Sequence, residues 1–452
     1  MDLDMVQKII KDNNIHYVRF EQTDIHGIAR SKTIPARHFV EKVTHGLGFY
    51  IGILGLDPQG GRASGSGYIE EKNNGDAILY PDLDTFRVLP WCANTARVLT
   101  DSTWHGKPTL AHPRHVAKQQ LERLAEMGYS LLSSCEYQFH LIDKVTKVPM
   151  TTDMMARATI RNNVNIDLVY DIMNNLHKVG LDIESMESQY APGQLELPYK
   201  PSFGIMSADN GFTFKTSIKE LALQKGFIAS FMTSPFMSIT ECGCPAGTFN
   251  GCHFNHSLWD KEKKSPLFYD STGRYVLSTI GENWLAGILE HAPSATCFFA
   301  PTVNCRKRYN DNIHSAWGMD NRTCPMRVKV NGEMRTYFEN RLGAAGSNPY
   351  LLLAATVASG IDGIQRKLPL TLPPISGESF DPHNIPPNAV KIPKNLGDAL
   401  DILEKDAILV EALGEDFIKC YLAVKRHEIA VGQVAEDKGD SEWEYKMYLE
   451  YI

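Results

Sequence analysis

Four short segments of this chain place acidic, imidazole and carboxamide side chains at alternating positions, as a β-strand would. Successive side chains of a strand point to opposite faces, so each polar set shares one face. The sets are, in chain order, Ser134, Glu136, Gln138 and His140; Glu196, after the tight turn of residues 191–194; His253, Asn255 and Ser257; and Glu339 with Arg341. These residue types are those that bind metal ions.

Hard divalent cations prefer carboxylate oxygens, and an imidazole can complete such a ligand shell. Glu136, Glu196, His253 and Glu339 would converge on a metal if the four strands belong to one sheet. Spacing alone leaves a second interpretation open, in which each polar stripe is the solvated face of an ordinary sheet.

A second group of residues with recognisable chemistry is basic. Residues 301–308 end in Arg-Lys-Arg, and Arg322, Arg327 and Arg341 follow in the next part of the sequence. Guanidinium groups match the oxygens of phosphates and carboxylates, so together with Arg308 these residues fit a polyanionic ligand. The alternative is a set of ordinary surface ion pairs.

The elements that must position these residues differ between the two parts of the chain. Residues 1–106 predict short strands and turns: a strand begins at 17–20, another spans 86–91, and the glycine-rich stretch 46–66 is a loop. The prolines and glycine of 104–113 predict a domain joint. Residues 107–452 alternate helices with strands, which predicts an α+β fold with helices packed on one large sheet.

Helix signals in the second part are periodic apolar residues bounded by caps. They predict helices at 114–127, 165–179, 211–225, 397–412 and 415–434, the third capped by Asp209 and Asn210. Residues 369–393 hold seven prolines and predict an irregular surface excursion. The aromatic segment 442–448 either docks on a neighbouring subunit or caps its own domain.

Composition excludes several classes of protein. The 452 residues are 43% apolar, which is enough for a large core and excludes a mainly disordered chain. The net charge of −7, with dispersed basic residues, argues against nucleic-acid binding. The sequence has no apolar run long enough to predict a membrane span, and we expect no secretory signal. We therefore expect a cytoplasmic protein.

The nine cysteines have no spacing typical of a disulfide framework, and we expect reduced thiols. Cys242 and Cys244 could be half of a zinc site. Because no second pair follows, a loop with two thiols is the preferred interpretation.

Many ordered stretches resemble the type I glutamine synthetase family, over nearly the whole chain. They include DLDTFRVLPW at 82–91, CEYQFHL at 135–141, APGQLEL at 191–197, HFNHSLW at 253–259, PTVNCRKR at 301–308, NRTCPMR at 321–327 and ENRLGAAGSNPYL at 339–351. Within the family, these stretches are most similar to those of a vertebrate lens branch, which is regarded as having lost catalysis and taken a structural role.

The resemblance implies a glutamine synthetase fold, with a small N-terminal β-grasp domain at 1–106. A large catalytic-type α/β domain with a curved antiparallel sheet would occupy 107–452. It also implies ATP with Mg²⁺ or Mn²⁺, no organic cofactor, and a homo-oligomer of two stacked hexameric rings, a dodecamer. In the family, ATP phosphorylates glutamate and ammonia then displaces phosphate.

Site residues follow from the same resemblance, one position at a time. Glu136, His253 and Glu339 match the ligands of the metal that binds the ATP phosphates. The glutamate-side metal takes three glutamates in the family, but Gln138 and Gln189 stand at two of these positions and only Glu196 remains. The arginines are kept. Arg308 and Arg341 match contacts to glutamate or phosphate, and Arg322 and Arg327 match contacts to nucleotide or phosphate.

Three further segments depart from the family pattern. Residues 248–253 read Thr-Phe-Asn-Gly-Cys-His where the family has Asn-Gly-Ser-Gly-Met-His. The flap, residues 309–316, has no glutamate to deprotonate ammonium, and Asp311 is its only acid. Residues 47–56 have no acid where an ammonium-binding aspartate is expected.

These departures favour a catalytically inactive or impaired family member with a structural or chaperone-like role. By resemblance to the lens branch, its partners would include intermediate filament proteins. The alternative is an active ATP-dependent ligase that joins glutamate to ammonia or to an amine, since the ATP-side residues are intact. A phosphagen-type kinase is a third interpretation, based on analogy alone.

Overall fold

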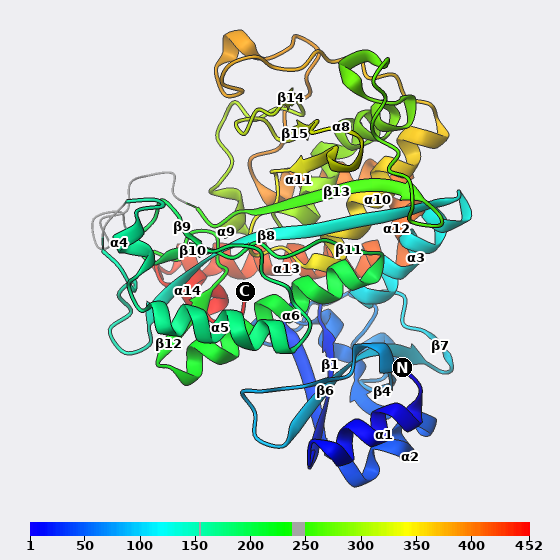
Figure 1. The fold of residues 1–452 in the computed structure, drawn as a ribbon, viewed down its shortest axis with the longest axis vertical. Helices are drawn as coiled ribbons and strands as arrows, with labels where there is room; N and C mark the ends of the chain where they lie inside the picture. The colour runs from blue at the N-terminus through cyan, green and yellow to red at the C-terminus, as the bar shows by residue number, and fades with distance from the viewer. Residues whose placement is uncertain (153–154, 237–248) are drawn as a thin grey trace.

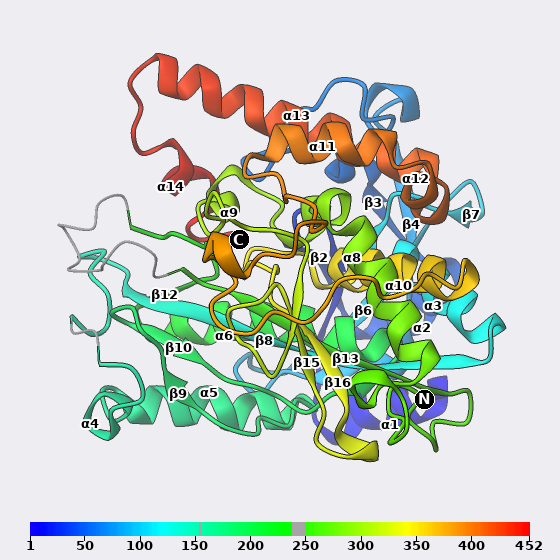
Figure 2. The ribbon, with the colours of Figure 1, turned by 90° about the horizontal axis from the view of Figure 1, so that it is seen from above.

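The computed structural model describes residues 1–152, 155–236 and 249–452. Its helices are α1 Leu3–Asp12, α2 Phe39–His45, α3 Pro113–Glu126, α4 Thr159–Asn162, α5 Ile166–Lys178, α6 Ile205–Gln224, α8 Thr279–Phe299, α9 Val303–Arg306, α10 Pro349–Gln365, α11 Leu396–Lys405, α12 Ala407–Leu413, α13 Glu415–Asp437 and α14 Trp443–Tyr448. Figures 1 and 2 show the arrangement from two directions.

The strands form two sheets. Within the described residues, the first sheet contains β1 Tyr17–Thr23, β2 Ala29–Pro35, β3 Leu47–Tyr50, β4 Asp76–Pro81, β5 Arg87–Val88, β6 Thr95–Trp104 and β7 Lys107–Pro108. The second contains β8 Tyr129–Asp143, β9 Glu187–Ser188, β10 Gln194–Glu196, β11 Ser202–Phe203, β12 Phe227–Ser230, β13 Cys252–Asp260, β14 Trp317–Met319, β15 Met326–Lys329 and β16 Tyr337–Asn340.

The first sheet has its own apolar layer beneath α1 and α2. Val18, Phe20, Phe39, Phe86 and Val98 form the centre of this layer. Residues 51–68, by contrast, contribute side chains to the core of the second sheet and its helices. In Figure 1 the blue N-terminal strands lie below the long strands β8 and β13. The division at 106/107 stays a prediction.

The second sheet is built around β8, whose length lets it pair with four other strands. β13 and β12 pair antiparallel with it along one edge, and β10 and β11 pair antiparallel with it along the other. Its apolar face follows the alternation in the sequence: Tyr137 and Phe139 are fully buried against Phe214 of α6 and against Phe231. The opposite face carries the polar stripe. The α+β architecture with a large, mainly antiparallel sheet is confirmed.

Helices α8 and α10 cross behind this sheet in close contact, and glycines make the approach possible. A Cβ atom on Gly363 would lie 2.1 Å from the carbonyl oxygen of Asn283, and one on Gly287 2.2 Å from that of Ser359. Any larger residue at these positions would push the two helices apart.

Two helix predictions were wrong in detail. α6 begins at Ile205, so Asp209 and Asn210 lie inside it and do not cap it. Asp209 instead accepts hydrogen bonds from Arg114 (Nε, 2.9 Å) and from the hydroxyl of Tyr350 (2.7 Å). The predicted helix 397–412 is two helices, because Asp406 leaves the helical conformation and caps α12 through Leu409 N–H.

Smaller corrections concern the first sheet and the chain end. The strand predicted at 86–91 is limited to the two residues of β5, and the predicted loop 46–66 contains β3. Segment 442–448 forms α14, which buries Trp443, Met447 and Tyr448 within its own chain. The excursion 369–393 has no strand or α-helix and is orange in Figure 1. Cys242 and Cys244 lie outside the described residues.

None of the described helices is both long and apolar enough to cross a membrane. The cysteines within the described residues are free thiols.

Candidate functional site

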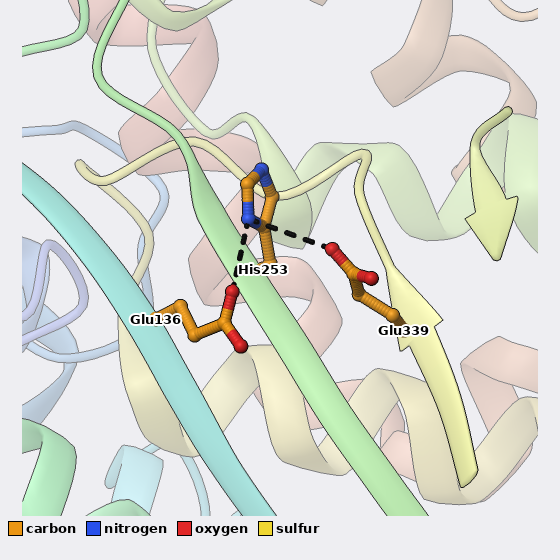
Figure 3. Close-up of side chains that lie close together, drawn as sticks. All are labelled: Glu136, His253 and Glu339. Carbon is orange, nitrogen blue, oxygen red and sulfur yellow. Dashed lines mark hydrogen bonds and ion pairs between the residues drawn. The ribbon is translucent and has the colours of Figure 1, made fainter. Parts of the chain in front are cut away.

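Glu136, His253 and Glu339 lie together on three neighbouring strands. β13 pairs with β8 and with β16, so His253 stands between the two carboxylates. Its Nδ1 is 3.4 Å from Glu136 Oε2 and 3.6 Å from Glu339 Oε1 (Figure 3). Each of the three residues offers one possible ligand atom, and these three atoms lie within 4.8 Å of one another. The sheet thus brings together the three residues that the resemblance assigned to the ATP-side metal.

The electrostatics of this triad suit a cation. Burial lowers the pKa of His253 well below its usual range, and the charge of Arg341 lowers it further. A neutral imidazole keeps a lone pair for a ligand bond. Glu136 accepts a hydrogen bond from Asn255 (2.8 Å), and Glu339 meets both Arg327 (2.9 Å) and Arg341. Two carboxylates and a neutral imidazole form a donor set that fits a divalent metal.

Gln138, Gln189 and Glu196 form a second cluster next to the triad. The Nε2 atoms of both glutamines donate to the same oxygen, Glu196 Oε2, each at 2.9 Å. The orientation of Gln138 is fixed, because the Gly251 N–H donates to its Oε1 (2.8 Å). Its amide hydrogens must therefore point toward Glu196. Burial, with the charge of Glu136, raises the pKa of Glu196 to about 7.

This arrangement does not fit a divalent metal. A cation at Glu196 would face two NH₂ groups, which are donors and have no lone pair to offer. Gln189 is in contact with Glu196. Its assignment as a former metal ligand stays a prediction.

The four arginines line the same cavity of about 800 Å³ as both clusters. Arg308 donates to the carbonyls of Arg341 (3.1 Å) and Gly343 (3.3 Å), and among the described residues no carboxylate pairs with it. Burial and the charge of Arg341 lower the pKa of Arg308 to about 10. Arg327 is bound between Asp320 and Glu339, whereas Arg322 is exposed at the rim.

The flap segment 309–316 is fastened to the proline-rich excursion. The Ser315 N–H donates to Val390 O (2.7 Å), and the Ile392 N–H donates to Ile313 O (3.0 Å). Asp311, the only acid of the segment, is exposed and pairs with Lys394 at 2.8 Å. It does not line the cavity. The flap therefore offers no carboxylate to a substrate.

Within their described residues, the two other departing segments add no carboxylate to the cavity. Asn250 is fully buried. Its Oδ1 accepts a hydrogen bond from Gln194 (2.8 Å) and its Nδ2 donates to Met232 O (2.8 Å), so the side chain stabilises the fold and is not available to a ligand. Asp57, just beyond the acid-free segment 47–56, closes its own turn by accepting from the N–H groups of Gln59 and Gly61. Residue 248 lies outside the described residues.

Sequence reasoning missed Arg157 and Glu187. They pair in a two-pronged ion pair at the edge of the cavity, with both N–O distances at 2.7 Å. Glu187 stands two residues before Gln189, a spacing that places both on one strand face. No feature of the sequence around Arg157 indicated its role.

Comparison with known families settles the membership of the chain. The glutamine synthetase catalytic domain matches residues 110–448. The chain belongs to the glutamine synthetase family.

Among its relatives is lengsin, 38% identical to this chain in both dog (Canis lupus familiaris) and human (Homo sapiens). Each match covers 99% of this chain, with 75% of the dog protein and 85% of the human protein. The glutamine synthetase of Methanococcus voltae is 31% identical and covers 99% of both chains.

Solved structures agree. A "novel glutamine synthase homolog" superposes with a TM-score of 0.82 at 25% identity, over 96% of this chain and 99% of the other. The structure titled "Apo GmaS without ligand" superposes with a TM-score of 0.83 at 26% identity, over 96% of each chain. The family resemblance inferred from the motifs is confirmed.

Proposed function

We propose that this protein binds nucleotide with one divalent metal, forms no glutamine, and serves as a structural assembly with a chaperone-like role. The observation that carries the proposal is the contrast between the two clusters. Glu136, His253 and Glu339 offer a donor set for a cation, whereas Glu196 is occupied by the amide hydrogens of Gln138 and Gln189.

In this proposal the triad would hold Mg²⁺ or Mn²⁺, which neutralises charge on nucleotide phosphates when bound. Arg308 and the exposed Arg322 have no carboxylate partner among the described residues, so their charges are available to anionic oxygens. Arg327 and Arg341 both contact Glu339, which orients that carboxylate toward His253. No organic cofactor is required.

Glutamine formation needs more than these groups supply. The reaction requires a cation on the glutamate side, an acid that binds ammonium and a base that takes the ammonium proton. In this chain the corresponding positions hold amides, a segment without acids and a flap whose only acid pairs with Lys394. Such losses each cost orders of magnitude in rate and do not add simply.

We further propose the ring dodecamer typical of the family, located in the cytoplasm. Large apolar side chains are exposed between residues 155 and 190: Met155 by 63%, Ile160 by 82% and Tyr190, which lines the cavity, by 58%. A neighbouring subunit would cover them. Native mass measurement at micromolar protein tests this, and only monomers or dimers would contradict it. Binding of intermediate filament proteins stays a prediction.

The intact triad supports one alternative, a ligase that uses an amine in place of ammonia, and so does Arg308, which has no carboxylate partner in the described part of the chain. A bulky amine would not need the missing ammonium aspartate. It would still need charge stabilisation at Glu196, which disfavours this alternative. No contact among the described residues favours a phosphagen-type kinase.

The deciding experiment is ATP turnover with glutamate and ammonium, then with a panel of amines, alongside metal counting in the presence of ADP. We expect one bound Mn²⁺ per chain and no glutamine. Glutamine formation at rates typical of the family would replace this proposal with the ligase. The variant Gln138→Glu/Gln189→Glu is expected to gain metal affinity without full turnover, because the flap base is still missing.

A further inference from the structure

The Glu196 end of the cavity contains a chain of hydrogen bonds that ends on a cation of the protein itself. Gln189 Nε2 donates not only to Glu196 but also to Glu187 Oε1 (2.8 Å). Glu187 in turn accepts both prongs of the Arg157 guanidinium. One continuous network therefore joins Gln138, Glu196, Gln189, Glu187 and Arg157.

The backbone holds Arg157 in place for this contact. Its φ of +60° lies in the left-handed region, which is uncommon for a residue with a side chain. Its N–H donates to the carbonyl and to the hydroxyl of Ser188, both at 3.1 Å. Ser188 lies between Glu187 and Gln189, so the backbone of Arg157 is fastened to the strand that carries both partners.

The charges of this network compensate one another only in part. It contains two carboxylates, Glu187 and Glu196, and one guanidinium, and the amides of the two glutamines supply the remaining hydrogen bonds. The charge of Arg157 also reaches Glu196: hydrogen bonding to Glu187 raises the pKa of Arg157, and Glu196 adds to that effect. A metal entering this end would have to displace amide hydrogens and face a fixed positive charge.

We propose that Arg157 is the resident counter-charge of this end of the cavity, and that with Gln138 and Gln189 it replaces and excludes a second divalent cation. This inference rests on the proposed single-metal site and adds a residue to it. Arg157 is here a positioning residue that acts through Glu187 and Gln189, and it makes this end of the cavity independent of metal.

The alternative is that Arg157 and Glu187 form an ordinary surface ion pair. The side chain of Arg157 is 47% exposed, and exposed pairs contribute little on average. Arg426 is a matched control: it is 43% exposed, makes a similar double contact with Asp401 and Glu404, and lies on α13, outside the residues that line the cavity. The two arginines should differ only in their effect on metal binding.

The test measures Mn²⁺ affinity by titration with ADP present. The reference protein is the Gln138→Glu/Gln189→Glu variant, and each further substitution is added to it. Adding Arg157→Gln should tighten the second Mn²⁺ about tenfold, because a nearby positive charge is removed and Glu187 is released as a further ligand. Adding Arg426→Gln should leave both affinities unchanged. Adding Arg157→Lys should restore the affinity of the reference, since the charge returns.

An equal second-site affinity with and without Arg157 would overturn the inference. The same holds if Arg426→Gln tightens binding as much as Arg157→Gln does. If the Arg157→Gln triple variant does not fold, Arg157→Met in the same background gives the same comparison. The unmodified protein is a separate arm: two Mn²⁺ bound there would refute the single-metal proposal, while the ratio between the variants still decides the role of Arg157.

Discussion

Two clusters within the described ranges contain a histidine between carboxylates, and their electrostatics are opposite. His253 faces the cavity between Glu136 and Glu339. His291 lies on α8, with Asp362 of α10 at 3.0 Å and Asp406, between α11 and α12, at 2.8 Å. By geometry alone, each cluster could hold a metal. In the second cluster the possible ligands are Glu290, His291 and Asp362.

Their surroundings decide the difference. At His253, burial and nearby arginines lower the pKa of the imidazole, so a nitrogen lone pair is available. At His291, burial is outweighed by hydrogen bonds to Asp406 and Asp362, which raise the pKa. Both nitrogens of His291 are engaged, and Arg366 already pairs with Asp362 at 3.0 Å. The same residue types thus make an open ligand set in one place and a closed link between helices in the other.

Metal binding should separate the two clusters most strongly. His253→Ala removes a direct ligand, so nucleotide-dependent Mn²⁺ affinity should fall by more than about 100-fold, the upper cost of losing an outer-shell partner. His291→Ala should leave this affinity within about twofold of the unmodified protein. Calorimetric titration of Mn²⁺ with ADP measures both, and equal losses would mean that the clusters do not differ as described.

Stability should show the reverse order. His291→Ala leaves two carboxylates facing each other without their shared hydrogen-bond donor, and should lower the free energy of unfolding by about 2 kcal/mol. His253→Ala should cost much less, because its imidazole is buried without a full set of partners. Urea denaturation followed by circular dichroism compares the two. A larger loss for His253→Ala would reverse the assignment.

Each cluster also has an arginine at its edge, which allows a second comparison. Arg308→Met should weaken ADP binding about tenfold, the value of roughly one charge-assisted hydrogen bond. Arg366→Met should not change ADP binding, since Arg366 pairs with Glu290 and Asp362 on the helical side. Fluorescence titration with ADP is a suitable measurement, and equal effects would remove Arg308 from the anion site.

The smallest expected effect is on the pH dependence of stability. The folded pKa of His291 is above the unfolded value of about 6.5, so its contribution is fully present below that pH. It is lost as pH rises through the folded pKa. The stability gap between the unmodified protein and His291→Asn should therefore narrow from pH 6 to pH 8. Thermal unfolding at several pH values measures this gap, and a constant gap would show that His291 is not charged when folded.

Most of the fold was predictable because local patterns and tertiary packing agree. The apolar alternation of residues 130–142 and the helical periodicity of 114–127 matched β8 and α3 closely. The errors arose where a polar residue serves a distant partner. Asp209 resembles a helix cap but pairs with Arg114, and Asp406 breaks a periodic segment to contact His291.

The site was predictable as a list of residues but not as a network. Motifs indicated Glu136, His253 and Glu339, and the sheet register brings them together. The hydrogen bonds from Gln138 and Gln189 to one oxygen of Glu196 depend on amide orientation, which no spacing encodes. Arg157 joins the cluster through a left-handed backbone conformation that its sequence does not signal.

The attachment of segment 309–316 to residues 390–392 has a kinetic consequence. Loops that close over a substrate commonly limit turnover, since they must open again to release product. Here two backbone hydrogen bonds fasten the segment to the excursion, and we expect it to stay in place as a wall of the cavity. Ligand exchange would then follow a single bimolecular step whose rate depends on diffusion and salt, with no slow gating phase.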